Sequence, residues 1–229
     1  MENPDLYLVP TPVGNLGDIT SRAIAVLQDV DRILAEDTRN TGRLLKHFEI
    51  STPMYAYHAH NEHKATAAIV ESLRSGQKMA LVTDAGTPGI SDPGYLLVRA
   101  CHDASLSVSC LPGANALLPA LAMSGIPCDR FYFEGFLPHK KGRQTRWKKL
   151  AELQVTTVLY ESPHRILKCL REMVEHIGPN TDVAVVKEIS KLYETIYRGM
   201  ASEVLLQLEE LPSIKGEYVV VFRGNDGDQ

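Results

Sequence analysis

Short apolar runs alternate with helical patterns through the first half of the chain. The runs occupy residues 6–9, 32–35, 54–57, 79–82 and 106–110. Each is short enough for a buried strand, and segments with apolar positions at helical spacing separate them. This alternation predicts a mainly parallel sheet with helices on both faces.

The pattern changes after the break at residues 125–130, where Gly, Pro and charged residues interrupt the apolar periodicity. Beyond it, strands are expected at 131–133, 155–160, 183–186, 194–197 and 218–222. Several of these follow one another without a full helix between them, which indicates a mixed sheet. We therefore expect two α/β domains, one spanning residues 1–125 and the other 126–229.

Polar clusters follow the strands of the first domain at residues 11–18, 36–39, 58–61 and 84–92. The carboxyl ends of parallel strands share one edge of a sheet, so these clusters should converge on one ligand site. The loop at 84–94 is rich in Gly and Pro, but it is neither a P-loop nor a spaced Gly-x-Gly-x-x-Gly. It predicts a small-molecule site without implying a triphosphate, although any one cluster alone would be an ordinary turn.

Composition limits the class of protein. The net charge of −4 argues against a general nucleic-acid coat but permits a local basic patch. The four cysteines are widely spaced, which fits reduced thiols better than a disulfide framework. The sequence shows neither a signal-peptide pattern nor an apolar run of the roughly 18 residues that a membrane span needs. These features predict a cytoplasmic protein without a membrane partner.

Three further segments each allow two interpretations. Residues 139–149 hold six Lys or Arg and Trp147, and they form either a phosphate-binding patch or the solvated face of a helix. His58, His60 and His63 could suggest zinc, but they lack its further ligands, so we expect no metal and interpret them as substrate contacts or helix-capping residues. Residues 187–194 are interpreted as a hairpin, with acid–base groups facing a site as the alternative.

A set of motifs carries a resemblance to a known family. They are TPVGNLGDIT at 11–20, EDTR at 36–39, DAGTPGISDPG at 84–94, LPGAN at 111–115, YESPHR at 160–165 and KEISK at 187–191. Together they resemble the tetrapyrrole-methylase-like superfamily of S-adenosylmethionine-dependent methyltransferases, over residues 6–222. Tetrapyrrole methylases carry a Gly-x-Gly-Pro-Gly-Asp type of first loop, whereas this chain has Thr11-Pro12-Val13-Gly14. That difference favours the RNA-modifying branch, which methylates a cytidine 2′-hydroxyl in small-subunit ribosomal RNA.

The resemblance implies two α/β domains of the tetrapyrrole methylase-like fold, S-adenosylmethionine folded into the cleft between them, and a homodimer. The implied cofactor-binding residues are Pro12, Val13, Asp84, Ala85, Gly86, Thr87, Ile90, Asn115, Ala116, Glu161 and Ile189. The small ribosomal subunit or its ribosomal RNA would be the partner, and DNA would not.

A 2′-hydroxyl must lose its proton during methyl transfer, so a base would help. Our candidates are Glu188 and Lys191, with Glu161 third; a neutral Lys191 would require a lowered pKa. Asp37, Arg39, His58, Asn61, Arg143 and Lys148 are the residues expected to position the RNA. Two alternatives stay open: a methyltransferase acting on a tetrapyrrole or another small molecule, and a non-enzymatic RNA-binding protein of the same fold.

Overall fold

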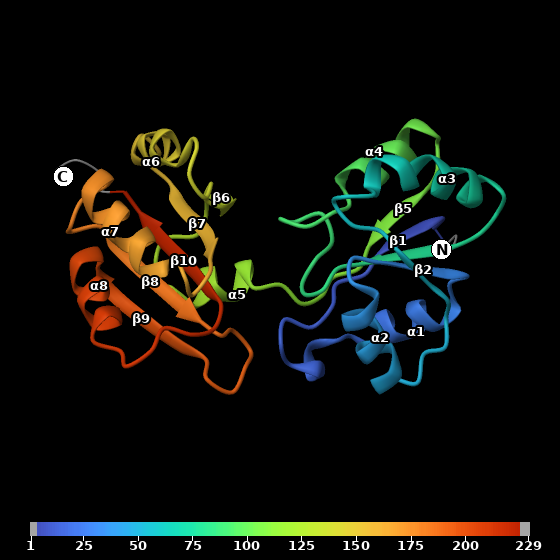
Figure 1. Cartoon of the computed structure of the whole chain (residues 1–229), viewed down its shortest axis with the longest axis horizontal. Helices are drawn as coiled ribbons and strands as arrows, with labels where there is room; N and C mark the ends of the chain where they lie inside the picture. The colour runs from blue at the N-terminus through green and yellow to red at the C-terminus, as the bar shows by residue number, and fades with distance from the viewer. Residues whose placement is uncertain (1–3, 225–229) are drawn as a thin grey trace. The chain divides into compact units, whose positions relative to one another are not determined.

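The computed structural model describes residues 4–224, which fold into two compact units that divide between Asn115 and Ala116 (Figure 1). The expected division lay after Gly125. It comes earlier because helix α5 (Leu117–Met123) packs its buried Ala120 and Leu121 on the sheet of the second unit. The Gly-rich break therefore follows the first helix of the second unit instead of preceding it.

The first unit holds a five-stranded parallel sheet in the order β3-β2-β4-β1-β5, as the alternation predicts. The strands are β1 (Leu6–Leu8), β2 (Arg32–Ala35), β3 (Met54–Ala56), β4 (Met79–Val82) and β5 (Val108–Cys110). Central strand β4 is buried at all four positions, which explains its continuous apolar run.

Two pairs of helices cover the two faces of this sheet (Figure 1). Buried side chains of α1 (Ser21–Asp29) and α2 (Thr38–His47) pack on one face. Those of α3 (Glu62–Arg74) and α4 (Tyr95–Asp103) pack on the other. A single 3₁₀ turn, η1 (Leu16–Asp18), precedes α1. The helices leave the carboxyl ends of the strands to the connecting loops.

The second unit holds a mixed five-stranded sheet in the order β6-β7-β10-β8-β9, again as predicted. Its elements after α5 are β6 (Phe131–Phe136), α6 (Arg143–Ala151), β7 (Thr156–Glu161), α7 (Ile166–His176), β8 (Asp182–Lys187), β9 (Thr195–Met200), α8 (Ala201–Glu209) and β10 (Tyr218–Arg223). Only β6 and β7 pair in parallel among these strands. Helices α6, α7 and α8 contribute to the core on one face, and α5 covers the other.

Among residues 4–224, no helix is both long enough and apolar enough to cross a bilayer.

Candidate active site

Two loops meet at the carboxyl edge of the first sheet. The backbone amides of Thr11 and Gly86 each donate to the other residue's carbonyl oxygen at 2.9 Å. The Thr11 hydroxyl donates to the carbonyl oxygen of Thr83, also at 2.9 Å, and Thr11 is buried. The loops after β1 and β4 are therefore held against each other by three hydrogen bonds.

Gly86 brings a third loop into the same place. Its φ of +83° is one that residues with a side chain rarely adopt. A Cβ atom on Gly86 would lie 3.7 Å from Val13 Cγ1 and 4.0 Å from Asn115 Cα. The Thr87 hydroxyl donates to the Ala114 carbonyl oxygen at 3.3 Å. Loops that follow β1, β4 and β5 thus converge around a glycine, which leaves its backbone open to close approach.

Asp84 connects this loop to the end of β2. Its Oδ1 accepts from the Asp37 amide at 3.3 Å, and its Oδ2 accepts from Asn40 Nδ2 at 3.0 Å. The Asp84 amide donates to Glu36 Oε2 at 3.5 Å. The predicted convergence of polar clusters at one rim is confirmed for the ends of β1, β2 and β4.

The rim is acidic. Burial, together with the nearby carboxylates of Glu36 and Asp84, raises the pKa of Asp92 to about 7. Burial also raises the pKa of Glu36, and the charge of Asp84 adds to that shift. At Asp37 the effect is opposite, because Arg39 donates to both carboxylate oxygens and lowers the pKa of that group. Shifts of this kind cluster at functional sites.

At the end of β3, two predicted RNA contacts form a turn. The His58 amide donates to Asn61 Oδ1 at 2.8 Å, and Asn61 Nδ2 donates to the Ala56 carbonyl oxygen at 2.9 Å. The rings of His58 and His60 lie edge to face at 6.0 Å. Within the described part of the chain, His, Cys, Asp and Glu side chains form no group of three or more that could hold a metal ion.

In the second unit, Glu161 lies in a buried ion-pair network. Its side chain has no exposed area, and its Oε1 accepts from Arg165 Nε at 2.9 Å and from the Ser162 amide at 2.8 Å. Arg143 approaches Glu161 Oε2 at 3.5 Å and donates to Glu172 Oε2 at 2.6 Å. The network links α6, β7 and α7 inside one unit.

The loop between β8 and β9 is the hairpin connection that we favoured, because the two strands pair antiparallel. Within it, Lys191 Nζ donates to Glu188 Oε1 at 2.9 Å and to Glu217 Oε2 at 2.8 Å. Burial disfavours the charge on Lys191, but these two hydrogen bonds outweigh it and raise the pKa of the ammonium. Burial likewise opposes ionisation of Glu188, yet bonds from the Glu217 amide and Lys191 leave its pKa lowered.

Comparison with known proteins identifies the fold and the family. The sequence model of the Tetrapyrrole (Corrin/Porphyrin) Methylases matches residues 5–205. The chain belongs to this family. It is 48% identical to the "Ribosomal RNA small subunit methyltransferase I" of Synechocystis sp. over 220 residues, which span 96% of this chain and 78% of that protein. It is also 48% identical to the protein of the same name from Vibrio cholerae, over 96% of this chain and 77% of that one.

A solved structure supports the fold independently. The methyltransferase CobJ aligns with a TM-score of 0.69 over 98% of this chain and 95% of that one, at 16% sequence identity. An identity this low shows the shared fold alone. The predicted fold class and family are therefore confirmed.

For a member of the tetrapyrrole methylase family, the structure brings together most cofactor residues predicted in the first unit. Val13 and Asn115 both lie within 4.0 Å of the place that a Cβ atom on Gly86 would take. The other predicted residues on these loops are Pro12, Asp84, Ala85, Thr87 and Ile90, and Ala116 follows Asn115. Ile189 lies in the second unit with its side chain buried in the core, so that only its backbone is available.

The side chains of Glu161 and Arg143 are committed to a buried network in the second unit. Both bind each other and neighbouring helices, so the backbone of Glu161 is the part that a cofactor could reach, and its catalytic and cofactor roles stay predictions. The Arg143 guanidinium is buried against Glu172 and Glu161, so its predicted contact with RNA phosphate would require this network to open. Trp147 is fully buried and donates to Glu172, so it offers no face for base stacking. Lys148, in contrast, is exposed.

Sequence reasoning missed Glu36 and Asp92 as individual residues. Glu36 directly follows β2, and Asp92 lies further along in the segment between β4 and α4, each in a motif that we had recognised. β2 and β4 are neighbours in the sheet. A prediction of that strand order would have placed Glu36 and Asp92 at the same site.

Proposed function

We propose that this chain transfers the methyl group of S-adenosylmethionine to the 2′-hydroxyl of a cytidine in small-subunit ribosomal RNA. The observation that carries the proposal is the 48% identity, over 96% of the chain, to relatives named for ribosomal RNA methylation. The low identity to CobJ gives no comparable reason to choose a tetrapyrrole as substrate.

The rim of the first sheet fits the methyl donor. The missing side chain at Gly86 lets a ligand approach the backbone of the converging loops closely, and Val13 lines the same place with an apolar side chain. Pro12, Val13, Gly86, Thr87, Ile90 and Asn115 would hold the cofactor, with Asp84, Ala85 and Ala116 beside them. When bound, S-adenosylmethionine supplies a methyl group that its sulfonium has already activated.

The contribution of the protein is then chiefly alignment. Holding two reactants in line can lower a barrier by about 7–11 kcal/mol. Lys191 is held protonated by Glu188 and Glu217, so it supplies positive charge in this arrangement and would have to lose a proton before it could act as a base. The catalytic roles of Glu188 and Lys191 stay predictions.

On the RNA side, we retain Lys148, Arg39 and His58 as positioning residues, and Asp37 and Asn61 as the residues that order their loops. Arg39 is exposed and held by Asp37. A 2′-hydroxyl is accessible in single-stranded or remodelled RNA. The proposal includes a homodimer that acts in the cytoplasm on the small subunit or its RNA.

A labelling assay tests this function. Purified protein is incubated with methyl-labelled S-adenosylmethionine and either small ribosomal subunits or uroporphyrinogen. We expect label in the RNA alone, in an alkali-resistant dinucleotide that contains cytidine. Label in the tetrapyrrole alone would overturn the RNA assignment, and a lack of cofactor binding at millimolar concentration in calorimetry would favour a non-enzymatic RNA-binding protein.

The chain offers a matched pair of variants for the cofactor site. Gly86 and Gly76 both have positive φ angles, +83° and +95°, so Ala imposes backbone strain at either position. Only the new Cβ at Gly86 would face Val13 and Asn115, whereas nothing lies within 4 Å at Gly76. Gly86→Ala should weaken binding of S-adenosylmethionine, and Gly76→Ala should leave it unchanged.

A further inference from the structure

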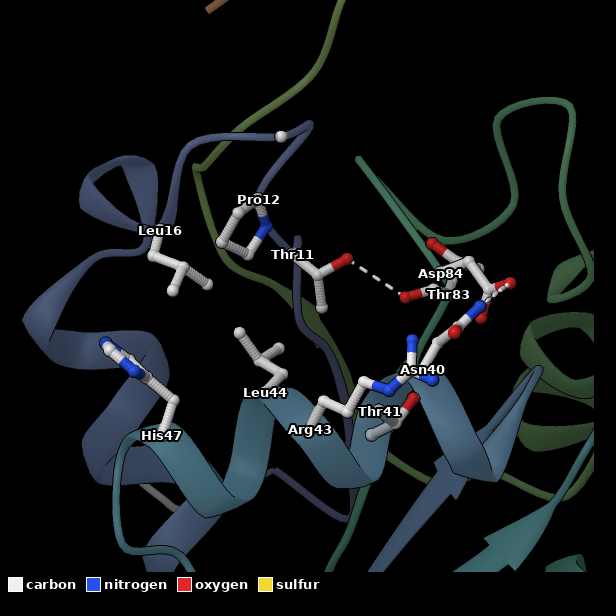
Figure 2. A pocket seen from close by; sticks show the side chains of 11 residues that line it. Thr11, Pro12, Leu16, Asn40, Thr41, Arg43, Leu44, His47, Thr83 and Asp84 are labelled. Atoms are coloured by element: carbon white, nitrogen blue, oxygen red, sulfur yellow. Dashed lines mark hydrogen bonds between the residues drawn. The ribbon is translucent and has the colours of Figure 1, made fainter. Parts of the chain in front are cut away.

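A cavity of about 340 Å³ opens in the first unit between the loop after β1 and helix α2 (Figure 2). It does not include Gly86, Val13 or Asn115, the residues at the centre of the proposed cofactor site. The lining residues are Thr11, Pro12, Gly14, Leu16, Asn40, Thr41, Arg43, Leu44, His47, Thr83 and Asp84. The cavity therefore shares the wall formed by Thr11, Pro12 and Asp84 with that site and lies on its α2 side.

One part of the lining is cationic. Arg43 and His47 are four residues apart on α2 and so lie on one side of the helix, and both are exposed. Figure 2 shows Leu44 and His47 rising from α2 toward the loop that carries Pro12 and Leu16, whereas Arg43 extends toward Asn40. Among residues 4–224, the Arg43 guanidinium makes no hydrogen bond or ion pair, whereas Arg39 on the same helix is held by Asp37. The N–H groups of the Arg43 guanidinium are thus available to donate hydrogen bonds to an anion.

The rest of the lining is apolar with a few fixed polar groups. Pro12, Leu16 and Leu44 supply the apolar surface. Asn40 Nδ2 is held by Asp84, which fixes both side chains at the inner end. Apolar side chains can pack on the face of a planar ring, and carboxylate and amide oxygens can accept from an amino group on its edge. This lining therefore suits a nucleic-acid base that carries an amino group.

Thr41 is the independent sign of a ligand. Its side chain lines the cavity, the residue is only 3% exposed, and its Oγ1 has no hydrogen-bond partner in the described part of the chain. A buried hydroxyl without a partner destabilises a protein unless something else bonds to it. A ligand whose entry shifts the neighbouring side chains would provide that bond.

We propose that this cavity binds one nucleotide of the substrate RNA, with its base against Leu16 and Leu44 and its phosphate at Arg43 and His47. The volume falls within the range of small-ligand pockets. The inference rests on the proposed function, since a nucleotide held beside Pro12 would anchor the RNA next to the methyl donor.

Binding of a fluorescein-labelled single-stranded oligoribonucleotide, followed by anisotropy at several KCl concentrations, tests the phosphate contact. Arg43→Gln should weaken binding about fivefold or more, the size of one charge-assisted contact. It should also reduce the log–log salt slope by about 0.7. The matched control is Arg74→Gln, which removes the same charge from an exposed surface pair on α3 and should change neither quantity.

Thr41→Val tests the inner end of the cavity. Replacing the hydroxyl by a methyl group of similar shape removes a buried polar atom that has no partner. We therefore expect an unchanged or higher melting temperature together with weaker RNA binding. A merely structural threonine would leave RNA binding as it is, and that result would contradict the proposal.

Calorimetry with S-adenosylmethionine separates the nucleotide from the cofactor. We expect all three variants to bind the cofactor as the wild type does. If Arg43→Gln weakens cofactor binding and leaves RNA binding intact, the cavity serves the cofactor and the inference fails. The anisotropy measurement needs no turnover, so it reports RNA binding at the cavity whether or not methyl transfer occurs. A wild-type protein that binds RNA at the cavity but transfers no methyl group would refute the proposed function and leave this inference standing.

Discussion

At the scale of single residues, the rim of the first sheet gathers three carboxylates. Asp92 carries no counter-ion among the described residues, and Glu36 and Asp84 are the charges that act on it. Burial and like charge both favour the protonated form of Asp92, so its pKa of about 7 lies far above the ordinary value of 3.8. The site therefore changes its charge close to neutral pH.

This shift links stability to pH. A carboxyl group whose pKa is raised by folding binds its proton more tightly in the folded state, so its contribution to stability falls as pH rises from about 4 to about 7. Asp92→Asn cannot ionise. We expect the variant to melt at a higher temperature than the wild type at pH 8, and the difference to shrink toward pH 5.

Thermal melts at the two pH values measure this effect. Asp29→Asn, at an exposed position of α1, is the control and should shift the melting temperature equally at both. Parallel pH profiles for the wild type and Asp92→Asn would show that Asp92 is an ordinary surface carboxylate.

At the scale of elements, helix α6 shows why a run of charges is not yet a binding surface. Arg143, Trp147 and Leu150 recur at a spacing of four and then three residues, which places them on one buried side of the helix. Lys148 and Lys149 lie on the exposed part. The carboxylates that neutralise Arg143 come from β7 and α7, 18 and 29 residues away in sequence.

The structure predicts opposite consequences for two basic residues of α6. Arg143→Met leaves Glu161 and Glu172 buried without that partner, so it should destabilise the protein by about 3–5 kcal/mol. Lys148→Met should change stability by less than about 0.5 kcal/mol. It should instead weaken RNA binding and lower the salt slope by about 0.7.

Urea unfolding and the salt dependence of RNA binding measure the two effects. Each variant serves as the control for the other. A stable Arg143→Met protein with a flattened salt dependence would place Arg143 on the RNA surface and contradict the buried network.

The same contrast explains how far the sequence could be interpreted. The strand–helix alternation predicted the parallel sheet and the shared rim, because strand ends in such a sheet are neighbours by topology. The network around Glu161 depends on which sides of α6 and α7 face each other, and no local pattern encodes that contact. The cavity beside Thr41 was missed for a similar reason, since α2 and the loop after β1 meet only in the folded unit.

At the scale of the whole molecule, a chain with a net charge of −4 must bind RNA through local features. We propose as such features the exposed lysines on α6 in one unit and Arg39 and Arg43, also exposed, on α2 in the other. The family membership supplies the methyltransferase fold, and the relatives' names supply the substrate that we propose.

A map of 2′-O-methylation in small-subunit ribosomal RNA, from cells with and without the gene for this chain, tests that claim most directly. We expect a single cytidine to lose its ribose methyl group when the gene is deleted. The wild-type gene should restore it, the Gly76→Ala gene should restore it as well, and Gly86→Ala should restore less. A map that is identical with and without the gene would contradict the account.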